Sequence, residues 1–310
     1  MVQNSANFCQ ALAAKIDVGK RMHRFEYFRP RSLMETISLL EEYGTRARML
    51  AGGTDLTVGL RHGHFHPDAV IDLKQVSELA PSIVVTADAV EIAASTVLMQ
   101  IIRHETMRRH FPALVEAADV VGSRQIRNRA TLAGNICNAS PAADTVPVLA
   151  VYGAMVIIFG PAGERRIPVT EFIQGNRKID LAKGELVTGV HLPLPKLPYG
   201  AAFDRITRRR GVDLATVNLC CGIGPNGRAV LALGAASPRP MVVHDVDGVF
   251  SDLSVSQEDR MAALTKILKP AAPISDVRAS AQYRHAMLTV MAQRSLIRAN
   301  QRLEESKNYA

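Results

Sequence analysis

The apolar residues of this chain recur with helical periodicity in some segments and with strand periodicity in others, which predicts a mixed fold. After Ser32, apolar residues recur at helical spacing. Ser32 and Glu35 have the spacing of a capping box, and Gly44 is typical of the residue that ends a helix. The pattern therefore predicts that a helix opens at Ser32 and ends at Gly44.

Short runs of apolar and β-branched residues predict strands in the following part of the chain. Turn residues at 87–89 and 160–163 lie between paired runs and indicate hairpins. Thr96, Pro112 and Asp144 are residue types that begin helices. The expected strands are 47–50, 69–73, 83–86, 90–94, 155–159 and 166–169, and the expected helices are 96–102, 112–120 and a short one from 144.

The proline-rich stretch Leu192–Pro198 indicates a linker, because proline lacks a backbone donor and blocks helix formation. A domain boundary is therefore expected near 193–199. Beyond it, strand-like runs at 201–208, 214–223 and 228–236 precede helical patterns at 256–268 and 277–302. We expect an α+β protein with one domain at 23–197 and a second at 199–304.

The composition is that of a globular protein, with 310 residues of which 47% are hydrophobic and 21% charged. No apolar run approaches the roughly 20 residues that span a bilayer, and no secretory signal is evident, so no membrane span is expected. The four cysteines show no Cys-x-x-Cys spacing, and the adjacent Cys220 and Cys221 point to opposite faces of a strand. These features favour a reducing, cytoplasmic compartment.

The positive charge of the chain raises the question of nucleic-acid binding. The net charge is +8 and the isoelectric point is about 9.5. The arginines are scattered, however, and no basic stripe interleaved with aromatic residues accompanies them. Solvated surfaces, subunit contacts and an anionic cofactor account for the arginines better, so we expect no nucleic-acid partner.

Two loops that are distant in sequence carry the candidate chemistry. The first, Ala51–Leu56, places two glycines after a short strand, where bare backbone N–H groups can approach an anion. The second, Ala130–Pro141, adds hydroxyl and amide groups, and the carboxylate of Asp144 follows it. The structural alternative is that the glycines only reverse the chain, the asparagines form turns and Asp144 caps a helix. Two such loops on one pyrophosphate would indicate a bound dinucleotide.

A literal G-x-G-x-x-G match at Gly222–Gly227 is interpreted as a hairpin and not as a dinucleotide fingerprint. A dinucleotide-binding loop must open a helix, whereas Pro225–Gly227 is a turn signal and a strand-like run follows from Arg228. Similarly, the alternating histidines at 62, 64 and 66 lie beside Gly63 and Pro67, which favours an exposed loop over a metal site.

At these loops the chain resembles the flavin-binding subunits of molybdenum-containing hydroxylases, the group of xanthine dehydrogenase, aerobic carbon monoxide dehydrogenase and nicotine dehydrogenase. The resemblance runs from about Phe25 to about Ser295 and includes further motifs in order: Phe25–Pro30, Ile71–Leu73, Gly122–Asn128 and Asp276–Arg284. It implies a flavin domain of the p-cresol methylhydroxylase type, then a small antiparallel sheet packed with helices. The family pattern begins near Met22, so residues 1–22 are expected to be a flexible N-terminal extension.

The resemblance also implies which residues bind the cofactor, FAD, without covalent attachment. Residues 50–55 would contact the phosphates and the second loop would close the other side, whereas Asp144, Leu186 and Arg205 match single contact positions of the family. Ala133 stands where the family usually has glycine. The full expected set is Leu50, Ala51, Gly52, Gly53, Thr54, Asp55, Ala94, Thr131, Gly134, Asn135, Asn138, Asp144, Leu186 and Arg205, with no catalytic acid or base and no metal ligand.

The implied function is electron transfer within a larger enzyme. A large molybdenum-pterin subunit would oxidise the substrate, a small iron–sulfur subunit would deliver electrons, and this chain would pass them to an external acceptor. The chain lacks the cysteines that an iron–sulfur cluster requires. Two alternatives remain open from the residues: a stand-alone FAD-dependent oxidoreductase of the same broad fold, and a basic binding module without a cofactor.

Overall fold

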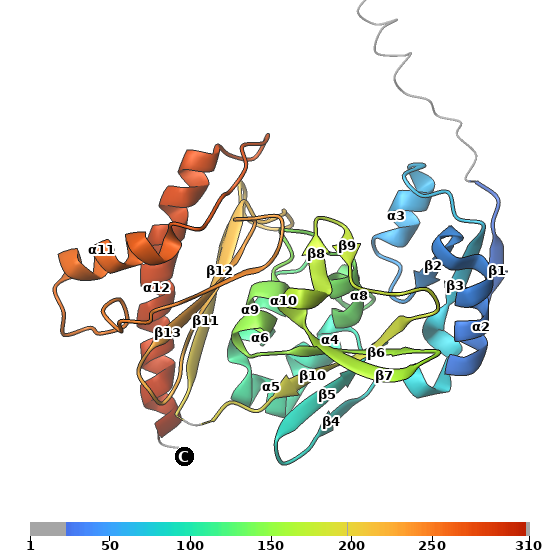
Figure 1. The fold of residues 1–310 in the computed structure, drawn as a ribbon, viewed down its shortest axis with the longest axis horizontal. Coiled ribbons are helices and arrows are strands. Elements are labelled where there is room, and N and C mark those ends of the chain that lie inside the picture. Colours follow the sequence, from blue (N-terminus) through green and yellow to red (C-terminus); the bar gives the residue numbers. More distant parts are fainter. Residues whose placement is uncertain (1–22, 197, 308–310) are drawn as a thin grey trace, which may run out of the picture.

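The computed structural model describes residues 23–196 and 198–307. The expected N-terminal extension, 1–22, lies outside the described residues. Three larger sheets follow one another from the start of the described chain to its end, and one two-stranded sheet accompanies them (Figure 1). Runs of consecutive helices and runs of consecutive strands follow one another along the chain, so the predicted α+β class is confirmed.

The first sheet is small and parallel. It consists of β1 (Glu26–Phe28), β3 (Ala69–Asp72) and β2 (Ala47–Leu50) in that order. Helix α2 (Leu33–Tyr43) begins where predicted, because the Ser32 hydroxyl accepts a hydrogen bond from the Glu35 N–H, and it ends at Gly44 with a φ of 52°. The chain then runs through the short helix η1 (Gly44–Arg46) into β2, whose end is the first glycine loop, and on to α3 (Leu56–Arg61).

The second sheet is antiparallel and has the order β4-β5-β10-β6-β7. Its strands are β4 (Ile83–Val85), β5 (Ala89–Ala93), β10 (Leu186–Pro193), β6 (Met155–Gly160) and β7 (Gly163–Pro168). Two further short helices, η2 (Leu73–Gln75) and η3 (Ser77–Leu79), connect it to the first sheet. Both predicted hairpins are confirmed, since β4 pairs with β5 and β6 pairs with β7.

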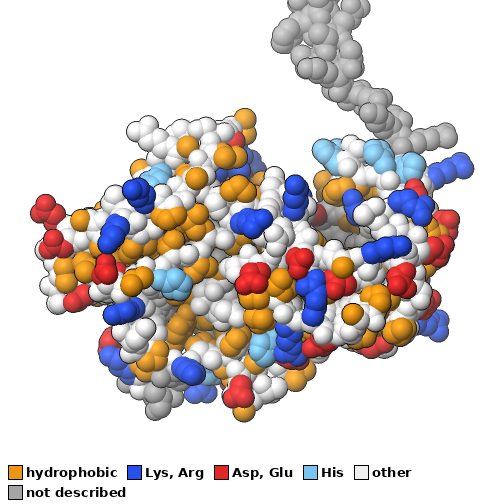
Figure 2. Space-filling model, viewed as in Figure 1, with side chains coloured by type: hydrophobic (Ala, Val, Ile, Leu, Met, Phe, Trp, Pro, Cys, Tyr) orange, Lys and Arg blue, Asp and Glu red, His pale blue; other side chains and the backbone are white. Residues whose placement is uncertain are grey.

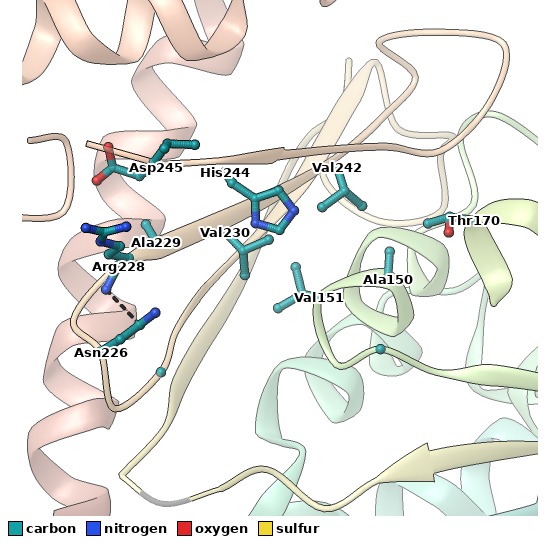
Figure 3. A pocket seen from close by; sticks show the side chains of 13 residues that line it. Ala150, Val151, Thr170, Asn226, Arg228, Ala229, Val230, Val242, His244 and Asp245 are labelled. Carbon is teal, nitrogen blue, oxygen red and sulfur yellow. Dashed lines mark hydrogen bonds between the residues drawn. The ribbon is translucent and has the colours of Figure 1, made fainter. Parts of the chain in front are cut away.

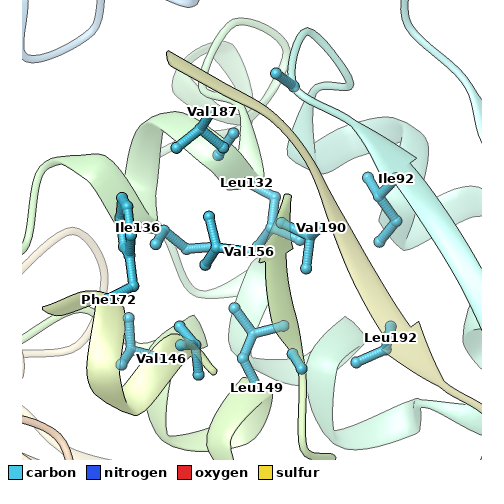
Figure 4. Close-up of a cluster of buried hydrophobic side chains, with 14 of the residues drawn as sticks. Ile92, Leu132, Ile136, Val146, Leu149, Val156, Phe172, Val187, Val190 and Leu192 are labelled. Atoms are coloured by element: carbon cyan, nitrogen blue, oxygen red, sulfur yellow. The ribbon is translucent and has the colours of Figure 1, made fainter. Parts of the chain in front are cut away.

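A helical layer packs against this second sheet. It contains α4 (Leu98–Arg103), α5 (Glu105–His110), α6 (Pro112–Asp119), α7 (Arg124–Arg127), α8 (Leu132–Cys137) and α9 (Thr145–Val151). Leu132 and Ile136 of α8 and Leu149 of α9 meet Val156 and Val190 of the strands in a buried cluster (Figure 4). Because this core fixes α8, it also fixes the second loop, which contains that helix.

The third sheet is a simple antiparallel meander of β11 (Gly200–Ile206), β12 (Val217–Ile223), β13 (Ala229–Gly234) and β14 (Met241–His244). The long helix α12 (Ala281–Lys307) packs on one of its faces with α11 (Gln257–Leu268), and α6 and α9 pack against the same sheet from the preceding part of the chain. Helix α10 (Val169–Phe172) and the strand pair β8 (Ile173–Gly175) and β9 (Lys178–Ile179) complete the described elements.

Several predicted boundaries are wrong. The helix expected from Thr96 begins at Leu98 after the cap residue Val97, because the Thr96 hydroxyl bonds the backbone of Ser82 instead. The last helix begins at Ala281 and not at 277, because Asp276 and Ala279 pair as an isolated bridge. Strand β12 is shorter than its predicted range, since it begins at Val217 and not at 214. Strand β7 begins at Gly163 and not at 166. No helix within 23–196 and 198–307 is long and apolar enough to cross a bilayer.

The close packing of α12 on β11 generates a test. A methyl group added at Gly200 would overlap the Ala299 carbonyl of α12, whereas one added at Gly175 would meet no atom within 4 Å. Overpacking of this kind typically costs 1–3 kcal/mol, so we expect Gly200→Ala to lower the free energy of unfolding by about 2 kcal/mol. Gly175→Ala, the matched control, should change it by about 0.5 kcal/mol at most. Denaturant unfolding of both variants measures the difference, and equal stabilities would show that the helix–strand contact is looser than described.

Candidate functional site

The two glycine loops converge on one cavity of about 550 Å³, a size typical of cofactor and ligand sites. A hollow is visible between the end of the molecule that carries α3 and its centre (Figure 2). Elements β2, α7, α8 and the β8–β9 turn contribute to its wall. Ten of the fourteen residues expected from the sequence line it: Ala51, Gly52, Gly53, Thr54, Asp55, Ala94, Thr131, Gly134, Asn135 and Asn138.

The two loops touch each other at Gly52. A Cβ atom at this position would overlap the backbone carbonyl of Arg129, just ahead of the second loop. The next residue, Gly53, has a φ of 77°, in the left-handed region where a side chain is strained. Glycine is therefore needed at both positions, for close approach at the first and for backbone conformation at the second.

The first loop presents unused backbone donors. Among the described residues, the N–H groups of Gly52, Gly53, Thr54 and Asp55 form no hydrogen bond. The Gly53 carbonyl accepts two hydrogen bonds from Thr57, one from its N–H at 3.0 Å and one from its hydroxyl at 2.6 Å. Successive free amides in a glycine turn form a concave site for an anion, and a phosphate group satisfies several at once. The residues present thus fit a pyrophosphate.

The second loop is ordered by its own side chains. Thr131 caps α8, and its hydroxyl accepts a hydrogen bond from the Gly134 N–H at 3.0 Å. The Asn135 side-chain carbonyl accepts one from the Thr145 hydroxyl at 2.7 Å, which leaves its amide donors free. Ala133, the departure from the family pattern, is almost fully buried and also lines the cavity.

Two arginines that the sequence analysis did not select also line the cavity. Arg177, in the β8–β9 turn, has a φ of 60°; its N–H donates to the Ala139 carbonyl and its guanidinium donates to Asn138. The guanidinium of Arg48, on β2, lies 5.6 Å from the centre of the Phe65 ring. Arginine is suited to phosphate recognition, so both side chains make the cavity more favourable for an anionic ligand. Neither lies in a motif, and no sequence signal pointed to them.

Four of the expected residues do not line the cavity. Leu50 lies between Met49 and Ala51, which both line the cavity, and Leu186 is fully buried beside Val187, which also lines it. Asp144 and Arg205 form a buried ion pair at 2.8 Å. Their assignment to the cofactor remains a prediction.

The Asp144 carboxylate joins two parts of the chain. It lies before α9, but its side chain does not cap that helix. Instead it accepts hydrogen bonds from the Arg205 guanidinium on β11 and from the Asn218 amide on β12, both at 2.8 Å. Burial raises the pKa of Asp144, while the nearby Arg205 charge and the two hydrogen bonds act in the opposite direction. The second loop is therefore fastened to the third sheet.

Cys137 faces the cavity but has no features of a nucleophile. Burial raises the pKa of its thiol to about 12, so the thiol is neutral near pH 7. The interpretation of Gly222–Gly227 is confirmed, because β12 ends at Ile223, a turn follows, and β13 begins at Ala229 without a helix. The histidines at 62, 64 and 66 follow α3, where Figure 2 shows imidazoles gathered on the surface. Within the described ranges, no group of three or more metal-ligating side chains forms a site.

Comparison with known proteins covers almost the whole described chain. Residues 23–195 match the family described as the FAD binding domain in molybdopterin dehydrogenase, and residues 201–299 match the CO dehydrogenase flavoprotein C-terminal domain. The xanthine dehydrogenase FAD-binding subunit of Escherichia coli O157:H7 is 30% identical over 278 residues, which cover 88% of this chain and 95% of that protein. The carbon monoxide dehydrogenase medium chain of Afipia carboxidovorans is 28% identical over 284 residues, 90% of this chain and 97% of that one.

Solved structures show the same fold. A carbon monoxide dehydrogenase chain from Hydrogenophaga pseudoflava superposes with a TM-score of 0.83 at 27% identity, over 91% of this chain and 99% of that one. A chain of quinoline 2-oxidoreductase from Pseudomonas putida 86 gives a TM-score of 0.81 at 28% identity, over 91% and 98%. The fold and the family that the sequence motifs indicated are confirmed.

The buried ion pair at Asp144 generates the second test. Asp144→Ala leaves the Arg205 guanidinium buried without its partner, so we expect a loss of about 3 kcal/mol in the free energy of unfolding. The control is Asp68→Ala, which breaks the exposed Arg46–Asp68 pair, also 2.8 Å long. An exposed pair contributes about 1 kcal/mol at most. Denaturant unfolding compares the two variants, and similar losses would mean that the Asp144 pair does not fasten the loop.

Proposed function

The chain belongs to the FAD-binding medium subunits of the molybdenum hydroxylase family, and from that premise we propose how it works within such an enzyme. It is an oxidoreductase component. We infer that its cavity between the two glycine loops holds one FAD. The flavin would receive electrons from an iron–sulfur partner subunit and pass them to an external acceptor.

One observation carries the proposal: two loops from distant sequence touch each other and share one cavity with unused amide donors. Gly52 fits directly against the backbone at Arg129, and four consecutive N–H groups of the first loop have no partner in the described chain. A chain reversal alone requires neither feature. Arg48 and Arg177 supply positive charge to the same space.

We assign distinct tasks to the residues around the cavity. The amides of residues 52–55 would bind the pyrophosphate, and Asn135 would donate its amide hydrogens from the facing loop. Leu50, Asp144, Leu186 and Arg205 would complete the set of residues that bind the cofactor. Bound FAD supplies the exchange between one-electron and two-electron transfers. The chain itself binds the dinucleotide, orients it and keeps the Cys137 thiol protonated beside it.

The partner assignment rests on the relatives. The names of several describe subunits or medium chains of dehydrogenases, including carbon monoxide dehydrogenase and a 6-hydroxypseudooxynicotine dehydrogenase complex. We infer that this chain likewise assembles with a large molybdenum-pterin subunit and a small iron–sulfur subunit. The division into a flavin domain at 23–197 and a second domain at 199–304 is part of the same proposal. The match of 201–299 to a CO dehydrogenase flavoprotein domain favours it over a stand-alone oxidoreductase.

The assembly can be tested by isolating the chain through an affinity tag from cells that express its neighbouring genes. We expect two further subunits in equal amounts, together with bound iron and molybdenum measured by elemental analysis. Recovery of a flavin-loaded single chain that oxidises a substrate unaided would instead establish the stand-alone enzyme.

The flavin site yields the third prediction. Purified protein should carry about one FAD per chain, released by denaturation and identified by chromatography. Gly53→Val places a branched side chain at a φ of 77° beside the free amides, so it should strongly deplete FAD. The control Gly224→Ala lies in the β12–β13 turn, where a Cβ meets no atom closer than 3.8 Å.

Absorbance ratios of the flavin and protein bands measure occupancy, and circular dichroism confirms that both variants fold. A colourless wild type that FAD cannot reconstitute contradicts the proposal. A folded, yellow Gly53→Val together with a colourless Gly224→Ala would place the nucleotide loop in the other half of the chain.

A further inference from the structure

A second cavity, of about 670 Å³, lies between the end of α9, α10 and the strands β13 and β14 (Figure 3). It shares no lining residue with the cavity between the glycine loops. Its volume falls within the range of small-molecule sites. The proposed flavin function leaves it without a role.

One part of this second cavity is apolar. Val151 comes from α9, Val230 from β13 and Val242 from β14, so the wall is built from both sides of the contact between helix and sheet. Figure 3 shows the His244 ring above Val230, with the side chain of Val151 nearby. Aliphatic side chains beside an imidazole ring form a surface on which a flat ring can pack.

The other part carries donors without partners. Within the described residues, no hydrogen bond or ion pair engages the guanidinium of Arg228 or the imidazole of His244. The Asn226 side chain accepts a hydrogen bond from the Arg228 N–H at 3.1 Å, which fixes the turn that carries the arginine. The one carboxylate in the wall, Asp245, is already used, since the N–H and the hydroxyl of Ser251 both donate to it at 2.7 Å.

We propose that this cavity binds a small organic anion that combines a flat aromatic ring with a carboxylate or a phosphate. The ring packs on Val151, Val230 and Val242. The anionic group binds Arg228 in charge-assisted hydrogen bonds, and the His244 ring borders the apolar part. The inference does not depend on the flavin assignment, because the two cavities are built from different residues.

The ligand class is tested by calorimetric titration of the purified full-length protein, with its flavin, against four probes. Benzoate and AMP carry both a ring and an anion, benzamide keeps the ring without the charge, and acetate keeps the charge without the ring. For molecules of this size we expect benzoate or AMP to bind with a Kd on the order of 1 mM. Benzamide and acetate should bind at least about tenfold more weakly. Preference between benzoate and AMP distinguishes a carboxylate ligand from a nucleotide phosphate.

The place of binding is tested with variants. Arg228→Gln removes an exposed, unpaired charge and should weaken the better anion by about tenfold. Val242→Phe should fill the apolar part and abolish binding. Arg31→Gln, a distant exposed arginine whose side chain forms no described contact, should leave affinity unchanged. All three should keep the flavin absorbance of the wild type.

Several results would overturn the proposal. They are absence of binding by both anions at millimolar concentration, benzamide or acetate binding as well as benzoate, and unchanged affinity in Arg228→Gln and Val242→Phe. Loss of flavin in the wild-type protein would count against the flavin assignment alone, since Arg228→Gln and Val242→Phe, which alter only the second cavity, decide whether the probes bind there.

Discussion

The buried contact of Asp144 with Arg205 and Asn218 is the constraint on which the arrangement of the cofactor cavity depends. It fixes the end of the second loop to β11 and β12 of the third sheet. The Ala235 N–H adds a hydrogen bond to the Pro141 carbonyl at 2.7 Å in the same contact. A buried carboxylate and guanidinium are costly when separated, so the loop and the sheet hold together as one unit. The third sheet and the core beneath α8 together thereby hold the donors of the second loop in place.

Helix α9 connects the region of the flavin cavity with the second cavity. Thr145, at its start, donates its hydroxyl hydrogen to Asn135 on the wall of the flavin cavity. Ala150 and Val151, at its end, line the second cavity. Between them the helix is buried in the main core and packs against β12 and β13. One short helix therefore lines the second cavity directly and holds a residue of the flavin-cavity wall through one hydrogen bond.

Local sequence signals identified much of the fold because they act over a few residues. Helix α2 begins after Ser32 and ends at Gly44 as expected. The turns at 87–89 and 160–163 connect the paired strands of two hairpins. Local signals failed where a distant partner competed for the same group. The Thr96 hydroxyl, for instance, bonds Ser82 across the chain and not the start of a helix.

The sequence by itself was enough to identify the two loops and the family and to reject the G-x-G-x-x-G match, since each of these conclusions rests on residue types in a fixed order. Only the tertiary structure decided that Gly52 fits against Arg129, that Arg48 and Arg177 face the cavity, and that Asp144 binds the third sheet. These contacts join segments far apart in the chain, and their geometry follows from how the three sheets pack. A long side chain such as arginine reaches many positions from one backbone site, so its destination is set by the packed fold and not by its neighbours in sequence.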